Sequence, residues 1–592
     1  MTTGTGNTLV GSLAGDSLTT GSSNTVLGYD ALSTEDEYGT NTAVGYQSLK
    51  ALNAGDNAYN VAVGFQTGLN ISTGIQNTII GSLAGDALTT GNYNIAIGHT
   101  ALSTEDTGHK SVAIGHQALL NQNYDGDAFN TAVGHNVGAA ITTGTQNTII
   151  GGLAGDALTT GMNNVAIGYS ALSTDDASSC NVAIGAHALE DLNVNATAYN
   201  TAVGHAAGRD ISTGTSNTIL GGLAGDALTA GSSSVAIGTQ ALSAEDDHSF
   251  NVAVGARALE VLNAGAHGYN TAVGYVAGAA MTTGVQNTLL GSRTGDALTT
   301  GSYNIAIGMD ALTTEDTGSR SVAIGTNALF NQNYDGDAYN VAIGMSAGSQ
   351  VSTGVRNTFV GGLAGDSLTT GSNNTAVGMF ALSAETGGGK NTALGYGALE
   401  LQNVNADGNN TAVGYNAGQV ISTGVRNTIV GSQAGDLLTT GINNTFVGFN
   451  AGGAVTDRSY NTGVGDSALG SNVNGAKNVA VGNGALAVMN PDSDLDTYNV
   501  AVGYDAGVSV TTGRYNTIVG AEAGDAIHTG EYNTVMGYQA LSAEDGNGKN
   551  VVMGAFAMQD LNAGADAENV AIGYVALGNA TTGKYNLSLI HI

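Results

Sequence analysis

The pentapeptide Asn181-Val182-Ala183-Ile184-Gly185 is one copy of a pattern, Asn-x-x-aliphatic-Gly, that runs through the whole chain. The pattern occurs in 33 units between Asn7 and the unit opened by Asn569, and each unit has Gly at its fifth position. Ser replaces the leading Asn only at Ser111, Ser234 and Ser321. A short period that spans an entire chain predicts a solenoid built from stacked coils.

The units are grouped into larger blocks of four. Within a block the leading position advances along the numbering by seventeen, seventeen, nineteen and seventeen, and the order of steps then begins again. Successive blocks open at Asn7, Asn77, Asn147, Asn217, Asn287, Asn357 and Asn427. Such repetition of whole blocks is tolerated in a solenoid, because each repeat contacts only its neighbours.

The block that opens at Asn427 departs from this regularity, because it contains one additional unit and the interval from Asn478 to Asn499 is longer than any other. We expect an insertion around residues 488–497 that is confined to one corner of the solenoid. Residues 1–6 are expected to be a lead-in and residues 7–585 one continuous repeat array. Residues 586–592 are expected to be a truncated or non-native tail, because Ile590 stands where the pattern requires Gly.

The two faces of the expected strand are both apolar. Alternation along a strand places Val182 and Ile184 on one face and Ala183 on the other. The fourth position is aliphatic or Met in every unit, so we expect it to face a core. The third position is also apolar and usually Ala, and a strand of this kind is typically buried on both sides. Since one face of a thin solenoid looks outward, the second apolar face predicts association with another copy of the chain.

The recurrent Gly and Asn suit particular places in such a coil. Gly fits a backbone position with positive φ, or a close approach that leaves no room for Cβ. The leading Asn, repeated once per coil, is expected to form a ladder of amides that hydrogen-bond from coil to coil. Helices are not expected, because Gly and β-branched residues recur throughout and no helical stripe of apolar residues is sustained.

Composition agrees with a thin repeated core. The 592 residues include 92 Gly, 1 Pro and no Trp, yet 42% are hydrophobic, which is too many for a disordered polymer. The net charge of −33 disfavours binding to nucleic acid and to anionic lipid. Cys180 is the only cysteine, so no disulfide framework is expected. The sequence contains no run of about 18 apolar residues, so no membrane span is predicted.

The repeat resembles two groups of fibrous proteins. SVAIG at 111–115 and 321–325 and NVAIG at 181–185 resemble the head repeats of YadA-like trimeric autotransporter adhesins. NTAVGYQSL at 41–49 and NTAVGYNAG at 410–418 resemble repeats of phage tail-fibre proteins. The resemblance implies an all-β, left-handed parallel β-roll of about 33 coils, packed side by side as a homotrimer. The coils here, whose lengths run from seventeen to twenty-one, are longer than those of the adhesin heads, so the corner loops are expected to differ.

Three histidines occupy one column of the repeat. His99, His116 and His135 each follow the recurrent Gly, so their rings are expected to stack. Zinc requires imidazole nitrogens about 2.0–2.1 Å away, whereas neighbouring coils lie about 4.8 Å apart. Because Tyr, Phe and Met fill this column elsewhere, a packing or surface role is favoured over a metal site.

Acidic residues recur at the expected corners. Paired carboxylates could serve acid–base chemistry, but a pair in every block is more typical of solvated turns than of an active site. The pairs are Glu35-Asp36, Glu105-Asp106, Asp175-Asp176, Glu245-Asp246 and Glu315-Asp316. We predict no catalytic residues, no cofactor and no dedicated metal site. The run Asp492, Asp494 and Asp496 is a weak candidate for Ca²⁺, since its spacing does not fit an EF-hand.

These patterns predict a non-catalytic fibre shaft or adhesin segment that presents a receptor-binding tip on a virion or cell surface. The expected partners are copies of the same chain and a host or cell-surface receptor contacted through the tip. Nucleic acid and membrane insertion are not expected in this segment. The alternative is a monomeric solenoid whose acidic corners bind Ca²⁺ or whose Thr-Thr-Gly columns, as at Thr19-Thr20 and Thr89-Thr90, bind ice.

Overall fold

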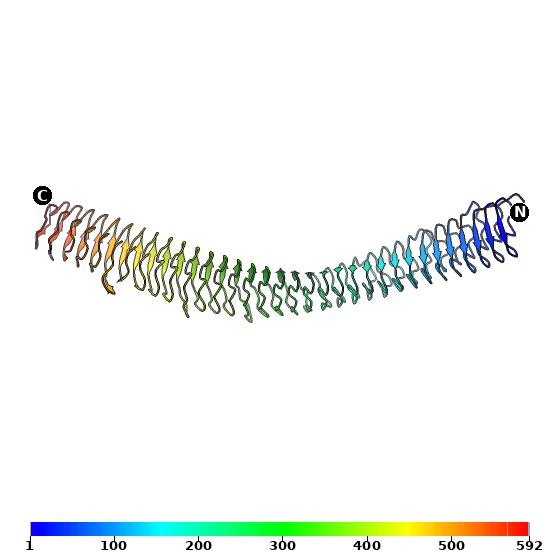
Figure 1. The fold of residues 1–592 in the computed structure, drawn as a ribbon, viewed down its shortest axis with the longest axis horizontal. Coiled ribbons are helices and arrows are strands. Elements are labelled where there is room, and N and C mark those ends of the chain that lie inside the picture. Colours follow the sequence, from blue (N-terminus) through cyan, green and yellow to red (C-terminus); the bar gives the residue numbers. More distant parts are fainter. Residues whose placement is uncertain (1, 547, 565, 590–592) are drawn as a thin grey trace. The chain divides into compact units, whose positions relative to one another are not determined.

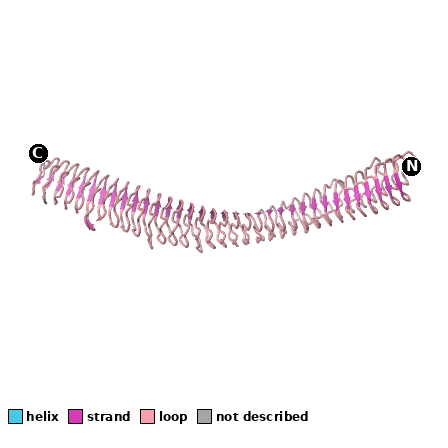
Figure 2. Cartoon of the chain, in the orientation of Figure 1, coloured by secondary structure: helices cyan, strands magenta, loops and turns pink. Residues whose placement is uncertain are grey.

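In the computed structural model, which describes residues 2–546, 548–564 and 566–589, the chain forms two compact units, Met1–Thr300 and Gly301–Ile592. Each unit is a parallel β-solenoid in which one short strand marks each turn (Figure 1). The remainder of each turn is loop, and the described residues contain no helix (Figure 2). The all-β parallel solenoid predicted from the repeat is therefore confirmed.

The strands follow one another at the spacing of the repeat. Those of the first unit are β1 (Thr8–Val10), β2 (Thr25–Leu27), β3 (Thr42–Val44), β4 (Val61–Val63), β5 (Thr78–Ile80), β6 (Ile95–Ile97), β7 (Val112–Ile114), β8 (Thr131–Val133), β9 (Thr148–Ile150), β10 (Val165–Ile167), β11 (Val182–Ile184), β12 (Thr201–Val203), β13 (Thr218–Leu220), β14 (Val235–Ile237), β15 (Val252–Val254), β16 (Thr271–Val273) and β17 (Thr288–Leu290).

Those of the second unit are β18 (Ile305–Ile307), β19 (Val322–Ile324), β20 (Val341–Ile343), β21 (Thr358–Val360), β22 (Thr375–Val377), β23 (Thr392–Leu394), β24 (Thr411–Val413), β25 (Thr428–Val430), β26 (Thr445–Val447), β27 (Thr462–Val464), β28 (Gly475–Ala476), β29 (Val479–Val481), β30 (Leu495–Asp496), β31 (Val500–Val502), β32 (Thr517–Val519), β33 (Thr534–Met536), β34 (Val551–Met553), β35 (Val570–Ile572) and β36 (Leu587–Ser588).

Neighbouring turns pair in parallel and without any shift of register. In β11 and β12, for example, Ala183 lies opposite Ala202 and Ile184 opposite Val203. Within the described residues, the ladders of the two units comprise 34 strands, which corresponds to about 34 turns. The structure has one turn more than the 33 predicted. The additional turn is the unit opened by Asn586, whose strand β36 pairs with β35. Residues 590–592 of the expected tail lie outside the described residues.

The core of each turn is narrow and built from small side chains. Ala183, at the third position of its pentad, is fully buried, and so are Ala188 and Leu189 from the loop that follows it. Burying a Leu side chain contributes about 2 kcal/mol relative to leaving it in water. Phe359 and Phe446 occupy the third position in two turns of the second unit and are also fully buried.

The prediction that the fourth position faces the core is wrong. Ile184 and its equivalents lie on the outer face of the strand, and it is the third position that points inward. The strands of each unit form a wall whose inner side meets the opposite loops of the same turn. The space between wall and loops holds Ala in most turns, and in other turns it holds a larger side chain such as Ile79 or Phe359.

Both reasons for a recurrent Gly at the fifth position hold. Gly81 has φ of +126°, a conformation that residues with a side chain rarely adopt. A Cβ on Gly81 would lie 2.5 Å from the carbonyl oxygen of Gly98 in the next turn. The backbones of successive turns therefore approach too closely at this column for any other residue.

The Asn ladder is present and buried. The backbone N–H of Asn164 donates to Oδ1 of Asn147 at 3.0 Å, and Nδ2 of Asn147 donates to the carbonyl of Gly161 at 2.9 Å. The Asn147 amide thus joins its own turn to the next through both of its polar atoms. A hydrogen bond of this type contributes about 1 kcal/mol net, but leaving one of these buried groups unpaired costs about 1–3 kcal/mol.

The longest step of the repeat adds a small local sheet. Its strand β30 pairs in parallel with β28 of the preceding turn, with Gly475 opposite Leu495. Nδ2 of Asn474 also donates to the carbonyl oxygen of Pro491 at 3.0 Å. The additional residues therefore extend one corner and leave the main ladder intact, since β29 pairs directly with β31.

Candidate functional site

A strip of aliphatic and threonine side chains runs along the outer face of the strands in each unit. We define the outer strip as the side chains at the second and fourth positions of the pentads, which are Thr, Val or Ile at the second position and Val, Ile, Leu or Met at the fourth, apart from the terminal β36. Fourth-position side chains that are between 37% and 54% exposed are Val10, Leu27, Ile80, Ile150, Leu220, Leu290, Ile343, Leu394, Val502, Met536, Met553 and Ile572. Contiguous exposed apolar surface of this kind is typical of a protein-interaction face.

Aromatic residues flank the strands in sequence on either side. After the recurrent Gly, Tyr46 stacks on Tyr29 at 5.4 Å and on Phe65 at 5.3 Å between ring centroids. Before the leading Asn, Tyr515 stacks on Tyr498 at 5.6 Å and on Tyr532 at 4.8 Å. The six rings are between 39% and 52% exposed, so the edges of the outer strip carry further apolar surface.

The predicted histidine stack is confirmed. The rings of His99 and His116 lie 5.4 Å apart and those of His116 and His135 lie 5.0 Å apart, in both cases nearly parallel. This is the ring-on-ring arrangement that the aromatic residues make in the same column of earlier turns. The histidines therefore continue the aromatic column.

The interpretation of the acidic pairs as solvated turns is wrong for the first member of each pair. The side chains of Glu35, Glu105, Asp175, Glu245 and Glu315 are all fully buried. Their burial is possible because each carboxylate accepts hydrogen bonds from its own loop or from the adjacent turn. Desolvation raises the pKa of all five carboxyl groups above the ordinary value, although these hydrogen bonds oppose the shift.

One class of corner uses a glutamine from the next turn, and we call it the Gly–Gln corner. At Glu105, Oε1 accepts from the backbone N–H of Gly108 at 2.7 Å and Oε2 accepts from Nε2 of Gln122 at 2.9 Å. The same Nε2 also donates to Ser111 Oγ at 2.8 Å, and Nδ2 of Asn130 donates to Gln122 Oε1 at 2.9 Å. Gln122 thus supplies the amide that Ser111 lacks. The corners at Glu315 with Gln332 and Glu385 with Gln402 repeat the contact between glutamine and glutamate at 2.8 and 2.9 Å.

The other class of corner, which we call the Leu corner, has a buried leucine where the glutamine would be. Its leucines follow the acid at the same interval that separates Gln122 from Glu105, and all four are buried; they are Leu52 after Glu35, Leu192 after Asp175, Leu262 after Glu245 and Leu561 after Glu544. In two of these corners the residue three positions after the acid supplies a side-chain donor or partner. Ser178 Oγ donates to Asp175, and His248 Nδ1 lies 3.1 Å from Glu245 Oε1.

Sequence reasoning missed these corners, although a signal for them exists. Ser111 and Ser321, two of the three exceptions to the leading Asn, are each followed by Gln eleven places later. Asn251 and Asn181, at equivalent places, are followed by Leu. In these turns, Ser at the first position of the pentad occurs with Gln eleven places later, and Asn occurs with Leu. This pairing indicates that the two positions are in contact.

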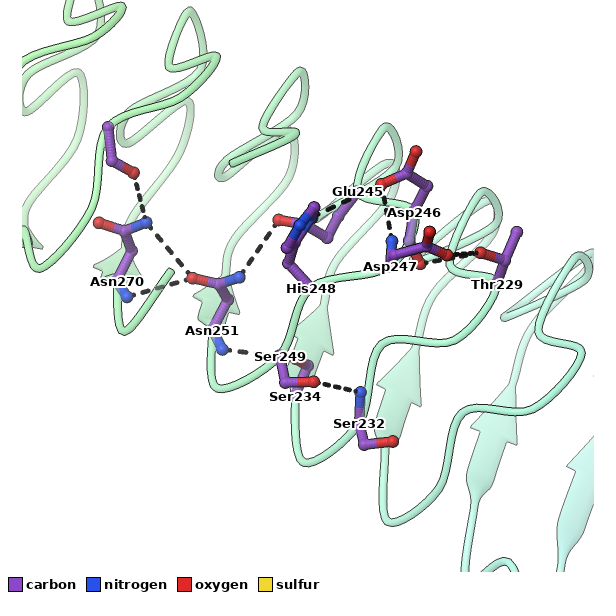
Figure 3. A network of polar contacts seen from close by, with 11 residues as sticks. Thr229, Ser232, Ser234, Glu245, Asp246, Asp247, His248, Ser249, Asn251 and Asn270 are labelled. Carbon is purple, nitrogen blue, oxygen red and sulfur yellow. Dashed lines mark hydrogen bonds and ion pairs between the residues drawn. The ribbon is translucent and has the colours of Figure 1, made fainter. Parts of the chain in front are cut away.

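The corner at Glu245 holds the most concentrated group of titratable side chains in the described residues (Figure 3). It lies between β14 and β15, and His248, Glu245 and Asp246 converge on one point of the loop. His248 Nδ1 lies 3.1 Å from Glu245 Oε1 and 3.7 Å from Asp246 Oδ1. Asn251, the leading Asn of the next turn, donates from Nδ2 to Glu245 Oε2 at 3.3 Å. Glu245 is buried, whereas His248 and Asp246 reach the surface.

The corner is anchored to the preceding turn. The carbonyl oxygen of Asp246 accepts from the backbone N–H of Thr229 at 2.7 Å. Thr229 Oγ1 donates to Asp247 Oδ1 at 2.5 Å, and the N–H of Asp247 donates to Asp246 Oδ1 at 2.6 Å. This last bond is the main reason that the pKa of Asp246 lies below its ordinary value.

The Asp492, Asp494 and Asp496 run is spread over different partners. Asp494 Oδ2 lies 2.6 Å from Arg458 Nη2, and Asp496 Oδ2 lies 2.5 Å from Lys477 Nζ. Within the described ranges, these three carboxylates do not form a group whose ligand atoms lie close enough to share an ion. In the loop that contains Asp125 and Asp127, Asp127 is likewise paired with a lysine, Lys110, at 2.7 Å.

The first hydroxyl of the Thr-Thr-Gly columns is hydrogen-bonded to the next turn. Thr19 Oγ1 donates to the carbonyl oxygen of Asp36 at 3.0 Å, and Thr89 Oγ1 donates to that of Asp106 at 3.0 Å. These hydroxyls therefore join successive turns at the acidic corners. Thr19 and Thr20 are both exposed, and Thr20 Oγ1 likewise donates to the next turn, to the carbonyl oxygen of Glu37 at 3.2 Å.

Comparison with protein-family models and with curated proteins finds no match to this chain. Among the residues that the structure describes, no helix could cross a lipid bilayer.

Proposed function

We propose that this chain is a non-catalytic shaft segment of a homotrimeric surface fibre or adhesin. Three left-handed solenoids would lie side by side and hold a receptor-binding tip away from a virion or a cell surface. The single observation that carries the proposal is the outer strip, a regular apolar face repeated on nearly every turn of both units.

The outer strip supports association with further copies of the same chain. A flat face with a fixed repeat matches best a surface with the same repeat, and another copy supplies that surface without any additional partner. Burial of exposed side chains such as Leu220 and Leu290 would remove apolar area from water at about 25 cal/mol per Å². The face that would meet another copy is therefore the one formed by the second and fourth positions, and not the third-position face expected from the sequence.

The distribution of charge supports a fibre in solution. The acidic residues lie at corners and loops, and the outer strip carries only Thr and aliphatic or Met side chains apart from the terminal strand. The net charge of −33 opposes binding to nucleic acid and to anionic lipid, and it keeps assembled fibres from aggregating laterally.

Light scattering coupled to gel filtration tests the proposal on the full chain. We expect a mass three times the 58.6 kDa of one chain. The variant Ile237→Lys/Val254→Lys places two charges on adjacent rungs of the outer strip and is expected to reduce the mass to that of one chain. The matched control Ala266→Lys adds a charge to an exposed loop position of the same turn as Val254 and is expected to remain trimeric. A folded wild-type protein with the mass of a single chain would refute the trimer.

A monomeric mass would favour the alternative, a solenoid that binds Ca²⁺ or ice. Calorimetric titration with Ca²⁺ and a thermal-hysteresis assay then distinguish the two ligands. Flat results in both assays would remove this alternative as well.

A further inference from the structure

We propose that Glu245, Asp246 and His248 form a binding site for one divalent transition-metal cation of the Zn²⁺ type. This inference is independent of the proposed fibre, because the three residues lie on a loop corner and not on the outer strip.

The distances between the three ligand atoms suit a single ion. Two ligands bound at about 2.1 Å in tetrahedral geometry lie about 3.4 Å from each other. His248 Nδ1 lies 3.1 Å from Glu245 Oε1 and 3.7 Å from Asp246 Oδ1, and one atom from each residue lies within 4.8 Å of the others. Small rotations of the side chains are enough to place all three around one cation.

The chemistry of the donors selects the class of metal. An imidazole nitrogen with two carboxylates suits Zn²⁺ and its neighbours, whereas Ca²⁺ and Mg²⁺ prefer oxygen ligands alone. Two carboxylates and a neutral imidazole have a charge of −2, which a divalent cation neutralises. Because Asp246 is 45% exposed in its side chain, water can complete the coordination.

The protein already positions the ligands. Asn251 Nδ2 donates to Glu245 Oε2 and so leaves Oε1 directed at His248. Asp247 N–H donates to Asp246 Oδ1 and orients that carboxylate. Hydrogen bonds of this kind to metal ligands commonly contribute about 10–100-fold to affinity.

The repeat provides internal controls for the histidine. The residue three positions after the buried acid is His only at His248 among the described corners, and elsewhere the equivalents are Tyr38, Gly108, Ser178, Gly318 and Gly388. The corner at Asp175 keeps the acidic pair and the buried leucine but has Ser178. His248→Ser therefore reproduces a combination that the chain already uses in another turn.

The experiment is titration of the metal-free full chain with ZnCl₂ by calorimetry, and with CoCl₂ by visible absorption. We expect one Zn²⁺ per chain and the d–d bands of a four-coordinate Co²⁺ complex with a nitrogen ligand. His248→Ser should weaken binding at least about tenfold and abolish these bands, while circular dichroism stays unchanged. Asp246→Asn should weaken binding by a smaller factor.

The matched control is His135→Ala, which removes a histidine from the stacked column and is expected to leave the stoichiometry and affinity unchanged. Zinc binding that survives in His248→Ser, or that disappears in His135→Ala, would assign the metal to other histidines and overturn the proposal. The absence of binding to the wild-type chain would overturn it too.

Discussion

The corners at Glu105 and Glu245 bury the same type of carboxylate but satisfy it with different donors. Glu105 bonds to a backbone N–H and to Gln122, a neutral side chain from the following turn. Glu245 bonds to His248 from its own loop and to Asn251, the leading Asn of the following turn. The comparison shows that the repeat can satisfy a buried corner carboxylate with alternative sets of donors.

The largest effect is expected from substitution of the fifth-position Gly of the pentad, which is present in the turns of both kinds of corner. Gly98 and Gly238 lie in the turns of Glu105 and Glu245 and have φ of +138° and +128°. Substitution by Ala should cost about 2–4 kcal/mol in either turn, through backbone strain and contact with the next turn. Hydrogen exchange measured on peptides from each turn checks this. A loss in one turn and none in the other would contradict a common backbone requirement.

A smaller effect is expected from Gln122→Leu, which imports the Leu of the other corner without its accompanying residues. Glu105 Oε2, Ser111 Oγ and Asn130 Nδ2 each lose a partner, so the local stability should fall by about 2–3 kcal/mol. Faster exchange of the backbone amide of Gly108 measures the loss. The triple variant Gly108→His/Ser111→Asn/Gln122→Leu completes the Leu corner and is expected to restore protection. Equal exchange in the single and triple variants would refute compensation.

The pH dependence sharpens the comparison further. Burial raises the pKa of the Glu105 carboxyl, so the folded chain holds this proton more tightly than the unfolded chain does. The corner is therefore most stable below the ordinary pKa of Glu and loses stability as the pH rises through the folded-state pKa. Protection factors at Gly108 should decrease over that range. Glu105→Gln should remove this slope, whatever its effect on absolute stability; an unchanged slope would assign it to other groups.

The smallest effect on stability is expected from substitution of the surface side chains that pair across adjacent turns near these corners. Next to the Gly–Gln corner at Glu105, Lys110 forms an ion pair with Asp127 at 2.7 Å, and both side chains are about two-fifths exposed. Next to the Leu corner at Glu245, Phe250 and His267 occupy the equivalent positions, and their ring centroids lie 5.0 Å apart. Lys110→Ala should cost about 0–1 kcal/mol, since exposed ion pairs contribute little. Thermal unfolding at low and high salt checks this, and a larger loss would mean that Lys110 also matters through its contact with Phe129.

Much of the architecture was predictable because it depends on spacing. The nearly constant step between units predicts parallel turns in register. Gly at the fifth position of every pentad predicts close contact between the backbones of successive turns. The stacking of His99, His116 and His135 follows from their common place in the unit. The burial of Glu245 could not be predicted in this way, because its partners are His248 and, from the next turn, Asn251.

The repeat unit was sufficient to specify a parallel β-solenoid, its register and its Asn ladder, because a side-chain period of two and a nearly constant step leave little freedom to the backbone. Which face of the strand becomes the core required the folded structure. Alternation separates Ala183 from Ile184 but does not say which lies inside. The inner third position accepts Ala in most turns and Phe359 or Phe446 in others, so residue size alone does not decide the face. The buried corner carboxylates depended on the fold in the same way, since only contact between successive turns brings their hydrogen-bond donors within reach.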